Sequence, residues 1–273
     1  MLSRRFVEFL KSWLVQNHEY VAHVLPHGYR AYSLYGGKIY LNVRESALML
    51  ERALGRYEMD KMEAVQKLLR PGVTFIDVGA NKGDFSLLAA MVVGNDGRIL
   101  VFEPEPMNCK WIGESIRLNG YKNISVFDFA LSDTNGPASL YLGEKSGLHT
   151  LLPGLPHHDK GTITISARTL DDVLADVKSK EIAMMKIDVE GAELRVLKGA
   201  ERTLVENQNI ILLIDIHPHL GVEPEDVMVY LRSLGFSMYQ MKSPFNVRLD
   251  RTTTPLEEVL AYRKLDAGFS SLN

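Results

Sequence analysis

The stretch "VTFIDVGANKGDFS", residues 73–86, decides the fold of this chain. It starts with an apolar run typical of a buried strand, passes through a loop that holds Gly79 and Gly83, and continues into an apolar helical segment over 84–93. Glycines at this place let the backbone pass close to a ligand at the N-terminus of the helix. The stretch predicts a strand, a ligand-binding loop and a helix, in that order.

Downstream of this stretch, short apolar segments keep alternating with longer amphipathic ones. The predicted strands cover 73–78, 98–103, 124–131, 182–189, 210–216 and 236–241, and the helices between them cover 84–93, 105–119, 191–206 and 224–234. Strands that alternate with helices are joined by right-handed crossovers and form a mainly parallel sheet with helices on both faces. The fold class is therefore α/β, doubly wound. Residues 134–168 predict a strand pair and a long surface loop.

The first seventy residues follow other patterns. Residues 29–43 alternate apolar and polar positions around Gly36 and Gly37, which predicts a hairpin, and 45–69 reads as a helix broken near Gly55. Phe6, Phe9, Leu10, Trp13 and Leu14 lie at helical spacing. That helix is expected to pack on its own domain or on a neighbour, with a membrane surface as the alternative. We expect residues 1–70 to form a helical and hairpin extension, acting as a substrate lid or a homodimer contact, and residues 71–273 to form the ligand-binding domain.

Composition excludes several functional classes. The 273 residues are 46% hydrophobic, enough for a sizeable core, and carry a formal net charge of −3 with no basic stripe, so no nucleic-acid partner is expected. The single cysteine, Cys109, excludes an internal disulfide framework. Glu8 and Lys11 interrupt the apolar run near the N-terminus, and no window reaches the length of a membrane span. A cytoplasmic location is expected.

Two acids frame the glycine loop. Asp77 ends the first strand, where its carboxylate suits a ligand with an ammonium group, and Glu103 ends the second, where a carboxylate can accept hydrogen bonds from both hydroxyls of a ribose. The loop lacks the glycine spacing of a dinucleotide site and the Lys-Ser/Thr pair of a P-loop. Either acid alone could simply cap a strand or helix. Together with Gly79 and Gly83 they match the needs of S-adenosylmethionine.

Five fragments in this order give a more specific resemblance: "IDVGANKGDFS", "VFEPEP", "NGYKNISVFDFALSD", "TLDD" and "KIDVEGAELRVLKGA". They resemble the FkbM family of S-adenosylmethionine-dependent methyltransferases over roughly residues 55–240. The resemblance implies a Rossmann-like sheet of seven mainly parallel strands. It also implies O-methylation of a hydroxyl on a sugar, glycan or secondary metabolite.

The resemblance also implies a set of cofactor-binding residues. Asp77, Gly79, Asn81 and Gly83 would hold the methionine part, with Ala80, Phe85 and Ser86 beside them, and Glu103 followed by Pro104 would hold the ribose. Asp128 would receive the adenine amino group, with the backbone of Phe129 and Ala130 along the base, although a backbone contact from Ala130 would serve as well. Glu58 matches a family position, or it is an ordinary helix-surface acid, and Asp188 completes the set.

The fragment "KIDVEGAELRVLKGA", residues 186–200, places three acids after a buried strand. Asp188 and Glu190 are expected to project over the sheet edge where methyl donor and acceptor meet. Glu193 lies one turn into the next helix, where a carboxylate favours the helix N-terminus, so its expected role is structural. Lys186 is expected to pair with one of these acids.

An alcohol acceptor must lose a proton, which calls for a carboxylate or an imidazole within hydrogen-bond reach. His217 in "IDIHPHL" is the first candidate base and Glu190 the second; Asp188 and the loop histidines His149, His157 and His158 are further candidates. Asp188, Asp215 and His217 could instead hold a divalent cation, which the resemblance does not require. No metal is favoured.

Two other functions stay open on the sequence alone. One is methyl transfer to nitrogen or to a carboxylate. The sequence lacks an N-P-P-Y-type strand end, which argues against DNA nitrogen and protein-amide nitrogen as acceptors. The other is a non-catalytic partner subunit that binds the cofactor. The intact glycines and acids of the cofactor site argue against this second function. The leading expectation is an O-methyltransferase with a small-molecule or glycan acceptor.

Overall fold

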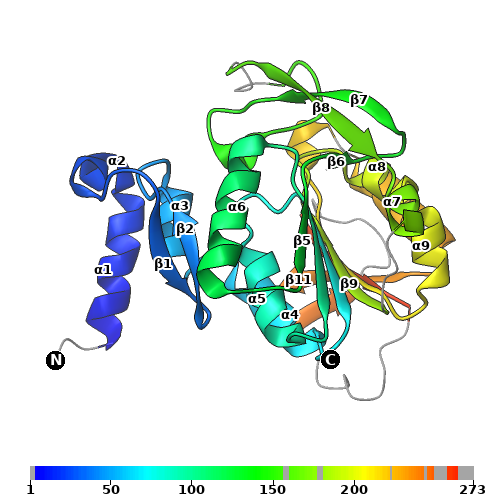
Figure 1. Ribbon diagram of the computed structural model, residues 1–273, viewed down its shortest axis with the longest axis horizontal. Helices are drawn as coiled ribbons and strands as arrows, with labels where there is room; N and C mark the ends of the chain where they lie inside the picture. The colour runs from blue at the N-terminus through cyan, green and yellow to red at the C-terminus, as the bar shows by residue number, and fades with distance from the viewer. Residues whose placement is uncertain are drawn as a thin grey trace.

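A central sheet flanked by helices, with a separate N-terminal extension at one side, makes up the molecule in the computed structural model (Figure 1). The structure describes residues 4–155, 160–176, 181–221, 223–242, 245–248 and 257–263. His157 and His158 lie outside the described residues. Among the helices that are described, none has both the length and the apolar character that a membrane span requires.

The central sheet confirms the doubly wound α/β class. Its strand order is β12-β11-β13-β10-β9-β3-β4-β5. In chain order the strands are β3 (Thr74–Val78), β4 (Arg98–Phe102), β5 (Ile124–Phe127), β9 (Ile182–Ile187), β10 (Ile211–Asp215), β11 (Ser237–Lys242), β12 (Phe245–Arg248) and β13 (Glu258–Tyr262). The strands from β10 to β5 pair in parallel, and β13, β11 and β12 add an antiparallel edge.

Of the three strands in this antiparallel edge, the sequence patterns predicted β11 but neither β12 nor β13. β12 adds an eighth strand because the chain turns back after β11 and pairs with it. β13 lies in the last thirty residues, where the sequence analysis found no usable motif, and it is inserted between β10 and β11.

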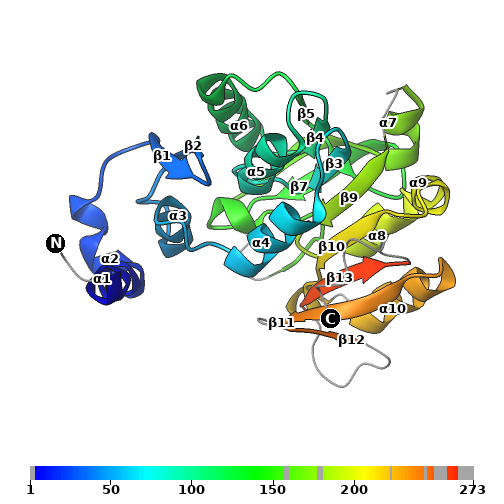
Figure 2. The same cartoon turned by 90° about the horizontal axis from the view of Figure 1, so that it is seen from below.

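Helices cover both faces of the sheet, as predicted (Figure 2). One face carries α4 (Met59–Leu68), α5 (Asp84–Val93) and α6 (Pro106–Asn119); the other carries α7 (Leu170–Asp176), α8 (Glu193–Lys198), α9 (Glu201–Glu206) and α10 (Pro224–Ser233). Alternation along β3 serves both layers: Phe75 packs in the first, and Ile76 and Val78 pack in the second. A strand buried on both faces explains the unbroken apolar run.

A small second sheet stands over the carboxyl end of the large one. The segment predicted as one strand over 124–131 divides into β5 and β6 (Ala130–Leu131), and β6 pairs with β8 (Thr162–Arg168), which pairs with β7 (Gly136–Tyr141). The expected strand pair within 134–168 is thus confirmed. The connection after β7 holds the short helix η2 (Ser146–Leu148) and His149.

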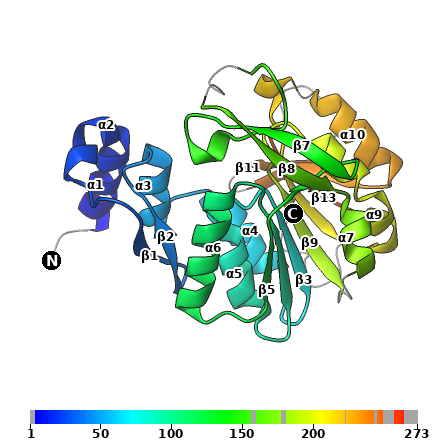
Figure 3. The ribbon, with the colours of Figure 1, turned by 45° about the horizontal axis from the view of Figure 1, so that its top comes forward.

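The N-terminal extension contains the predicted helix and hairpin (Figure 3). It comprises α1 (Arg4–Gln16), α2 (His18–Val21), η1 (Ala22–Val24), β1 (Arg30–Leu34), β2 (Gly37–Leu41) and α3 (Ala47–Ala53). The predicted helix over 45–69 is interrupted as expected, because Gly55 has a φ of +66°. Its second half, α4, belongs to the core beside α5.

Candidate active site

The loop after β3 passes very close to the end of β9. Gly79 has a φ of +75°, and a Cβ on it would lie 1.8 Å from the carbonyl oxygen of Asp188. Gly83 also has a positive φ, +84°, and caps α5, where an added Cβ would lie 3.2 Å from Ile112. Both glycines are therefore required by the backbone path, and Gly79 is required by the close contact as well.

Asp77 lies beneath this loop, fully buried on the α5 side of the sheet. Its Oδ2 accepts a hydrogen bond of 2.5 Å from the Ser86 hydroxyl, and its Oδ1 is buried without a hydrogen-bond partner in the described structure. Burial raises the pKa of Asp77, whereas the charge of Lys186 on the neighbouring strand lowers it. Ser86 thus contacts this acid from α5, and Phe85 of the same helix is buried in the core on that side of the sheet.

Glu103 follows β4 and is held by the chain around it. Its Oε2 accepts from the Asn81 N–H at 2.7 Å, and its Oε1 accepts from the Glu105 N–H at 2.9 Å and from Asn108 Nδ2 at 3.3 Å. Burial raises the pKa of Glu103 to about 7, although these hydrogen bonds lower it. The carboxylate thus has a fixed position, held by Asn81 of the loop after β3 and by Glu105 and Asn108 at the start of α6.

A first pocket of about 600 Å³ opens between the two sheets. Eight of its lining residues were predicted for the site from the sequence, namely Gly79, Asn81, Glu103, Pro104, Ala130, His149, Asp188 and Glu190. The main further lining residues are Val78, Phe102, Leu131, Leu140, Ser146, Gly147, Leu151 and Val189. Carbon-rich walls with a fixed carboxylate suit a nucleoside. The structure thus brings together eight residues that were expected at the site.

Other predicted cofactor residues lie away from this pocket. Asp128 is exposed and does not line it, and the Phe129 ring packs beside Phe102 and Phe127. Ala80 and Gly83 are part of the loop but not of the lining. Of the two residues that were expected to contact adenine, Ala130 lines the pocket and Asp128 does not.

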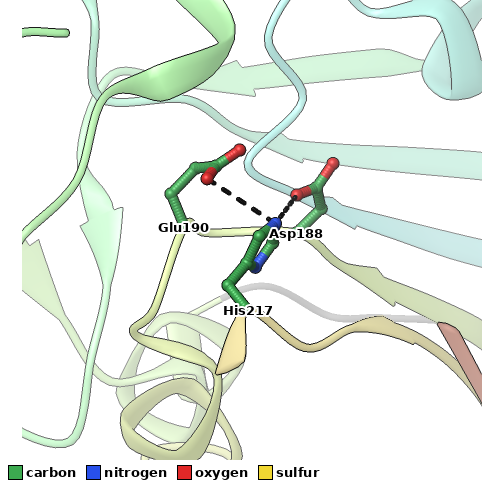
Figure 4. A group of neighbouring side chains, drawn as sticks. All are labelled: Asp188, Glu190 and His217. Carbon is green, nitrogen blue, oxygen red and sulfur yellow. Dashed lines mark ion pairs between the residues drawn. The ribbon is translucent and has the colours of Figure 1, made fainter. Parts of the chain in front are cut away.

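A cluster of charged side chains gathers at the ends of β9 and β10, and Figure 4 shows Asp188, Glu190 and His217 from it. His217 Nε2 lies 3.6 Å from Asp188 Oδ1 and 3.6 Å from Glu190 Oε2, and its Nδ1 lies 2.7 Å from Glu193 Oε1. Lys186 pairs with Asp188 at 3.0 Å, as predicted. Glu193 is fully buried and also accepts the Gly191 N–H at 3.0 Å, so it binds both its own helix start and the imidazole.

The charges in this cluster shift its titration. Burial alone lowers the pKa of His217, but the hydrogen bond to Glu193 and the charges of Glu190 and Asp188 raise it to about 9. Burial raises the pKa of Glu190 to about 8, against the opposing effect of His217. Burial also raises the pKa of Asp188, yet Lys186 and His217 together lower it below its ordinary value. Within this cluster, His217 and Glu190 are therefore the groups that exchange protons as the pH rises above neutrality.

A second pocket of about 870 Å³ adjoins the first. The two share Asn81, Gly147, Asp188 and Glu190. The second is lined further by Leu48, Arg52, Tyr57, Glu58, Lys61, Leu148, Asp215, Ile216, His217, His219, Glu257 and Glu258. Two ligands placed in these pockets would meet beside Asp188 and Glu190, which is the arrangement that in-line transfer between them requires.

Lys61 neutralises part of the second pocket. Its Nζ lies 2.8 Å from Asp215 Oδ2, 3.0 Å from Glu58 Oε1 and 3.2 Å from Glu258 Oε1. The sequence analysis missed this lysine, because Lys61 and Asp215 are 154 residues apart and no spacing pattern links them. It missed the contact of Glu193 with His217 for the same reason.

Two groups within the described structure have metal-ligating atoms close together. One is Asp188, Glu190 and His217, and the other is Glu58, Asp188 and Asp215, with ligand atoms within 4.8 Å of one another in each. Neither group joins Asp215 to His217, the pair named in the expected metal set. In the second group the Lys61 ammonium already binds Glu58 and Asp215.

Comparison with known proteins identifies the family that this geometry belongs to. The model of the methyltransferase FkbM domain matches residues 77–238. The hexuronic acid methyltransferase AglP of Haloferax volcanii is 29% identical over 164 residues, which span 59% of this chain and 62% of AglP. The methyltransferase sdnD of Sordaria araneosa is 27% identical over 195 residues, covering 60% of this chain and 73% of sdnD. The crystal structure of methyltransferase FkbM from Methylobacillus flagellatus superposes with a TM-score of 0.48 at 18% identity, covering 92% of this chain and 60% of that one.

Proposed function

Because the chain belongs to the FkbM methyltransferase family, we propose that it transfers a methyl group from S-adenosylmethionine to a hydroxyl of a sugar, a glycan or a secondary metabolite. The observation that carries this proposal is the junction of two pockets at Asp188 and Glu190. The sugar-type acceptor is favoured by the likeness to AglP, whose name describes it as acting on a hexuronic acid.

The residues of the first pocket fit the cofactor. Glu103 presents a fixed carboxylate for the ribose hydroxyls, Gly79 leaves room that a Cβ would fill, and Ala130 lies on the wall expected to border the base. Asn81 and Asp188 line the same pocket toward its neighbour, where the methionine part would lie. When bound, S-adenosylmethionine supplies an electrophilic methyl on a sulfonium.

His217, paired with Glu190, is proposed as the group that takes the proton from the acceptor hydroxyl. Glu193 holds Nδ1, so Nε2 faces the side where both pockets open. The raised pKa values of His217 and Glu190, about 9 and about 8, mean that the pair gains its base form as the pH rises above neutrality. The chain's own contribution is to position the acceptor and accept this proton.

We propose residues 71–273 as the methyltransferase domain and residues 1–70 as an extension that shapes the acceptor side. In support of this, Leu48, Arg52 and Tyr57 line the second pocket, together with Glu58 and Lys61 at the start of α4, the part of this segment that packs in the core. A lid that supplies part of the second pocket would affect which acceptor is bound and would not affect cofactor binding.

The test of the proposal is mass spectrometry of a panel of glycans and small metabolites incubated with the protein and a labelled methyl donor. We expect a mass gain of one methyl group on a hydroxyl, and calorimetric binding of S-adenosylhomocysteine. His217→Ala should spare that binding and lower turnover by at least about a hundredfold, as for loss of a general base. Full activity of the variant would remove His217 from the mechanism, and binding without any methylation would favour the partner-subunit function.

A further inference from the structure

A buried lysine lies beside the cofactor pocket without lining it. Lys82 belongs to the loop after β3, is only 2% exposed, and is not among the lining residues of the first or the second pocket. A buried ammonium group needs partners, because removing a charge from water without them is costly. The partners of Lys82 therefore indicate what it does.

Three side chains surround the Lys82 ammonium group. Its Nζ donates to Asn108 Oδ1 at 2.9 Å and to the Tyr29 hydroxyl at 3.3 Å, and it lies 3.7 Å from Glu45 Oε2. Asn108 is the most buried of the three partners, at 1% exposure. Water cannot replace the contact between Lys82 and Asn108, so this contact is the one that depends on the lysine.

The Asn108 amide connects this lysine with the acid that is expected to bind the ribose. Its Nδ2 donates to Glu103 Oε1 at 3.3 Å, while its Oδ1 accepts from Lys82. An ammonium group donates hydrogen bonds and accepts none, so it requires the oxygen end of the amide. Lys82 thereby selects the one of two amide orientations that turns the NH₂ end toward Glu103.

The two orientations favour different protonation states of Glu103. Burial raises the pKa of Glu103, and the hydrogen bond from Asn108 is among those that lower it. With its oxygen facing Glu103, the amide would instead accept a hydrogen bond from the protonated acid. By holding Oδ1, Lys82 thus favours the ionised carboxylate, which is the form that accepts hydrogen bonds from ribose hydroxyls.

Charged groups around this pair act in both directions. Burial lowers the pKa of Lys82, the charges of Glu45, Glu105 and Glu103 raise it, and the charge of Arg52 lowers it further. The charge of Glu105 adds to burial in raising the pKa of Glu103. Three carboxylates therefore favour the charged lysine that the contact with Asn108 requires.

We propose, on the basis of the cofactor site proposed above, that Lys82 is a positioning residue, which holds the Asn108 amide with its NH₂ toward Glu103 and so prepares that carboxylate for the ribose. Lys82 itself contacts no ligand. Its effect is expected on cofactor affinity and on the pH dependence of that affinity, and not on the choice of acceptor.

Calorimetric binding of S-adenosylhomocysteine across the neutral pH range tests this role without an acceptor. Lys82→Met has nearly the length of lysine and no donor. The pH at which affinity has risen halfway should increase by at least about half a unit, and affinity at pH 7 should fall by at least about twofold. Lys122→Met removes an exposed lysine between α6 and β5 and should change neither.

Two further variants show whether Lys82 acts through Asn108. In the Asn108→Leu background, Lys82→Met should move the midpoint by less than about 0.2 units, because the amide that transmits the effect is absent. Tyr29→Phe removes the hydrogen bond from Lys82 to the extension, keeps Asn108, and should not move the midpoint. An equal shift in both Asn108 backgrounds, or a shift in Tyr29→Phe, would overturn the proposal.

Circular dichroism checks the fold of each variant, and Lys82→Gln replaces Lys82→Met if that variant does not fold. Glutamine can present either end of its own amide, so it does not fix the orientation of Asn108, and the same shift is expected. NMR of the unmodified chain provides an independent measurement. The Asn108 side-chain amide should titrate with a midpoint near pH 7, since it donates to Glu103. An amide that does not respond to pH in this range would also overturn the proposal.

The outcomes separate this inference from the proposed function. The expected shift in binding, without methylation of any acceptor, would keep the inference and reject the methyl-transfer function. Methylation by a chain whose binding is unchanged in Lys82→Met would keep the function and overturn the inference. Failure of the unmodified chain to bind S-adenosylhomocysteine would reject both.

Discussion

At the scale of single residues, fixed carboxylates dominate the site. Glu103 is positioned by backbone N–H groups of Asn81 and Glu105, and Glu193 by the Gly191 N–H. Backbone donors position an acid without adding a charge of opposite sign, so each carboxylate keeps lone pairs for a further hydrogen-bond donor. Predictions at this scale concern pH.

The first prediction concerns cofactor affinity. Burial raises the pKa of Glu103 to about 7, so this acid loses its charge as the pH falls through neutrality. Because an ionised carboxylate accepts ribose hydroxyls better, S-adenosylhomocysteine should bind up to about tenfold more tightly at pH 8 than at pH 6. Calorimetry at the two pH values measures this difference.

Glu103 variants supply the control for that experiment. Glu103→Ala should weaken binding by about 1–3 kcal/mol, and Glu103→Gln should remove the pH dependence. Asp128→Asn alters an exposed acid outside the pocket lining and should change neither. A pH dependence that persists in Glu103→Gln would assign it to another group.

The second prediction concerns the pH profile of turnover. We expect kcat to rise between pH 7 and pH 9, as the pair formed by Glu190 and His217 loses a proton. Glu193→Gln keeps a hydrogen-bond acceptor for His217 but removes the charge that raises the pKa of the imidazole. The rising limb should therefore move to lower pH by about one unit.

The measurement is a stopped assay of labelled methyl transfer across this pH range. Affinity for S-adenosylhomocysteine should be the same in Glu193→Gln as in the unmodified chain, which separates an effect on the imidazole from a general loss of folding. An unshifted limb would mean that Glu193 has only the structural role at the start of α8 that its sequence position indicated.

At the scale of elements, the site is formed where loops meet strand ends. The loop after β3 contacts the end of β9 through Gly79, and α4 contacts the edge of the sheet through Lys61. Both are contacts between elements far apart in sequence, and both can be broken by one substitution. For each contact, another residue of the same type that lacks the contact serves as the control substitution.

The third prediction uses the two glycines Gly79 and Gly120. Gly79→Ala places a Cβ 1.8 Å from a backbone oxygen, so the loop must move, and we expect a loss of about 3 kcal/mol in the free energy of unfolding and no measurable cofactor binding. Gly120 has a similar φ, +70°, in the left-handed region with open space around it, so Gly120→Ala should cost about 1 kcal/mol. Equal losses in urea unfolding would contradict the close-contact explanation.

The fourth prediction uses two lysines of α4. Lys61→Ala leaves the carboxylates of Asp215 and Glu58 without their cation in a buried site, so the free energy of unfolding should fall by about 3–5 kcal/mol. Lys67 pairs with Glu63 at the surface, where the two side chains are 61% and 60% exposed, and Lys67→Ala should cost less than about 1 kcal/mol. Chemical denaturation of both variants tests the contrast.

At the scale of the whole molecule, α1 is set apart from the sheet (Figure 1). It exposes Phe9 and Trp13, at 65% and 44%. The expectation that the N-terminal extension forms a homodimer contact stays a prediction, and these side chains are where it can be tested. An apolar face of this kind is costly to leave in water if the chain is monomeric.

The fifth prediction is therefore about mass in solution. Light scattering should give a dimer for the unmodified chain and a monomer for the double variant Phe9→Glu, Trp13→Glu, since a charge in an apolar contact is not compensated. Circular dichroism and S-adenosylhomocysteine binding should be unchanged in the variant, because neither residue lines the first or the second pocket. A monomer in both cases would reject the dimer.

The sequence determined the parts of the protein that depend on local spacing. Strand and helix periods predicted the doubly wound sheet, the hairpin and the small strand pair, because side-chain direction repeats with a fixed period in each element. The position of Glu103 after its strand and of Gly79 after β3 followed from the same local rules, since a strand end and the turn beyond it are set by adjacent residues.

Only the tertiary structure decided which of these residues meet. His217 and Glu193 are 24 residues apart, and Lys61 and Asp215 are 154 apart, and no period relates such pairs. The same is true of β13, whose place between β10 and β11 depends on edge pairing and not on its own pattern. Partners of this kind are selected by packing of the whole chain, because a buried charge is stable only where folding brings it an opposite charge or a hydrogen bond.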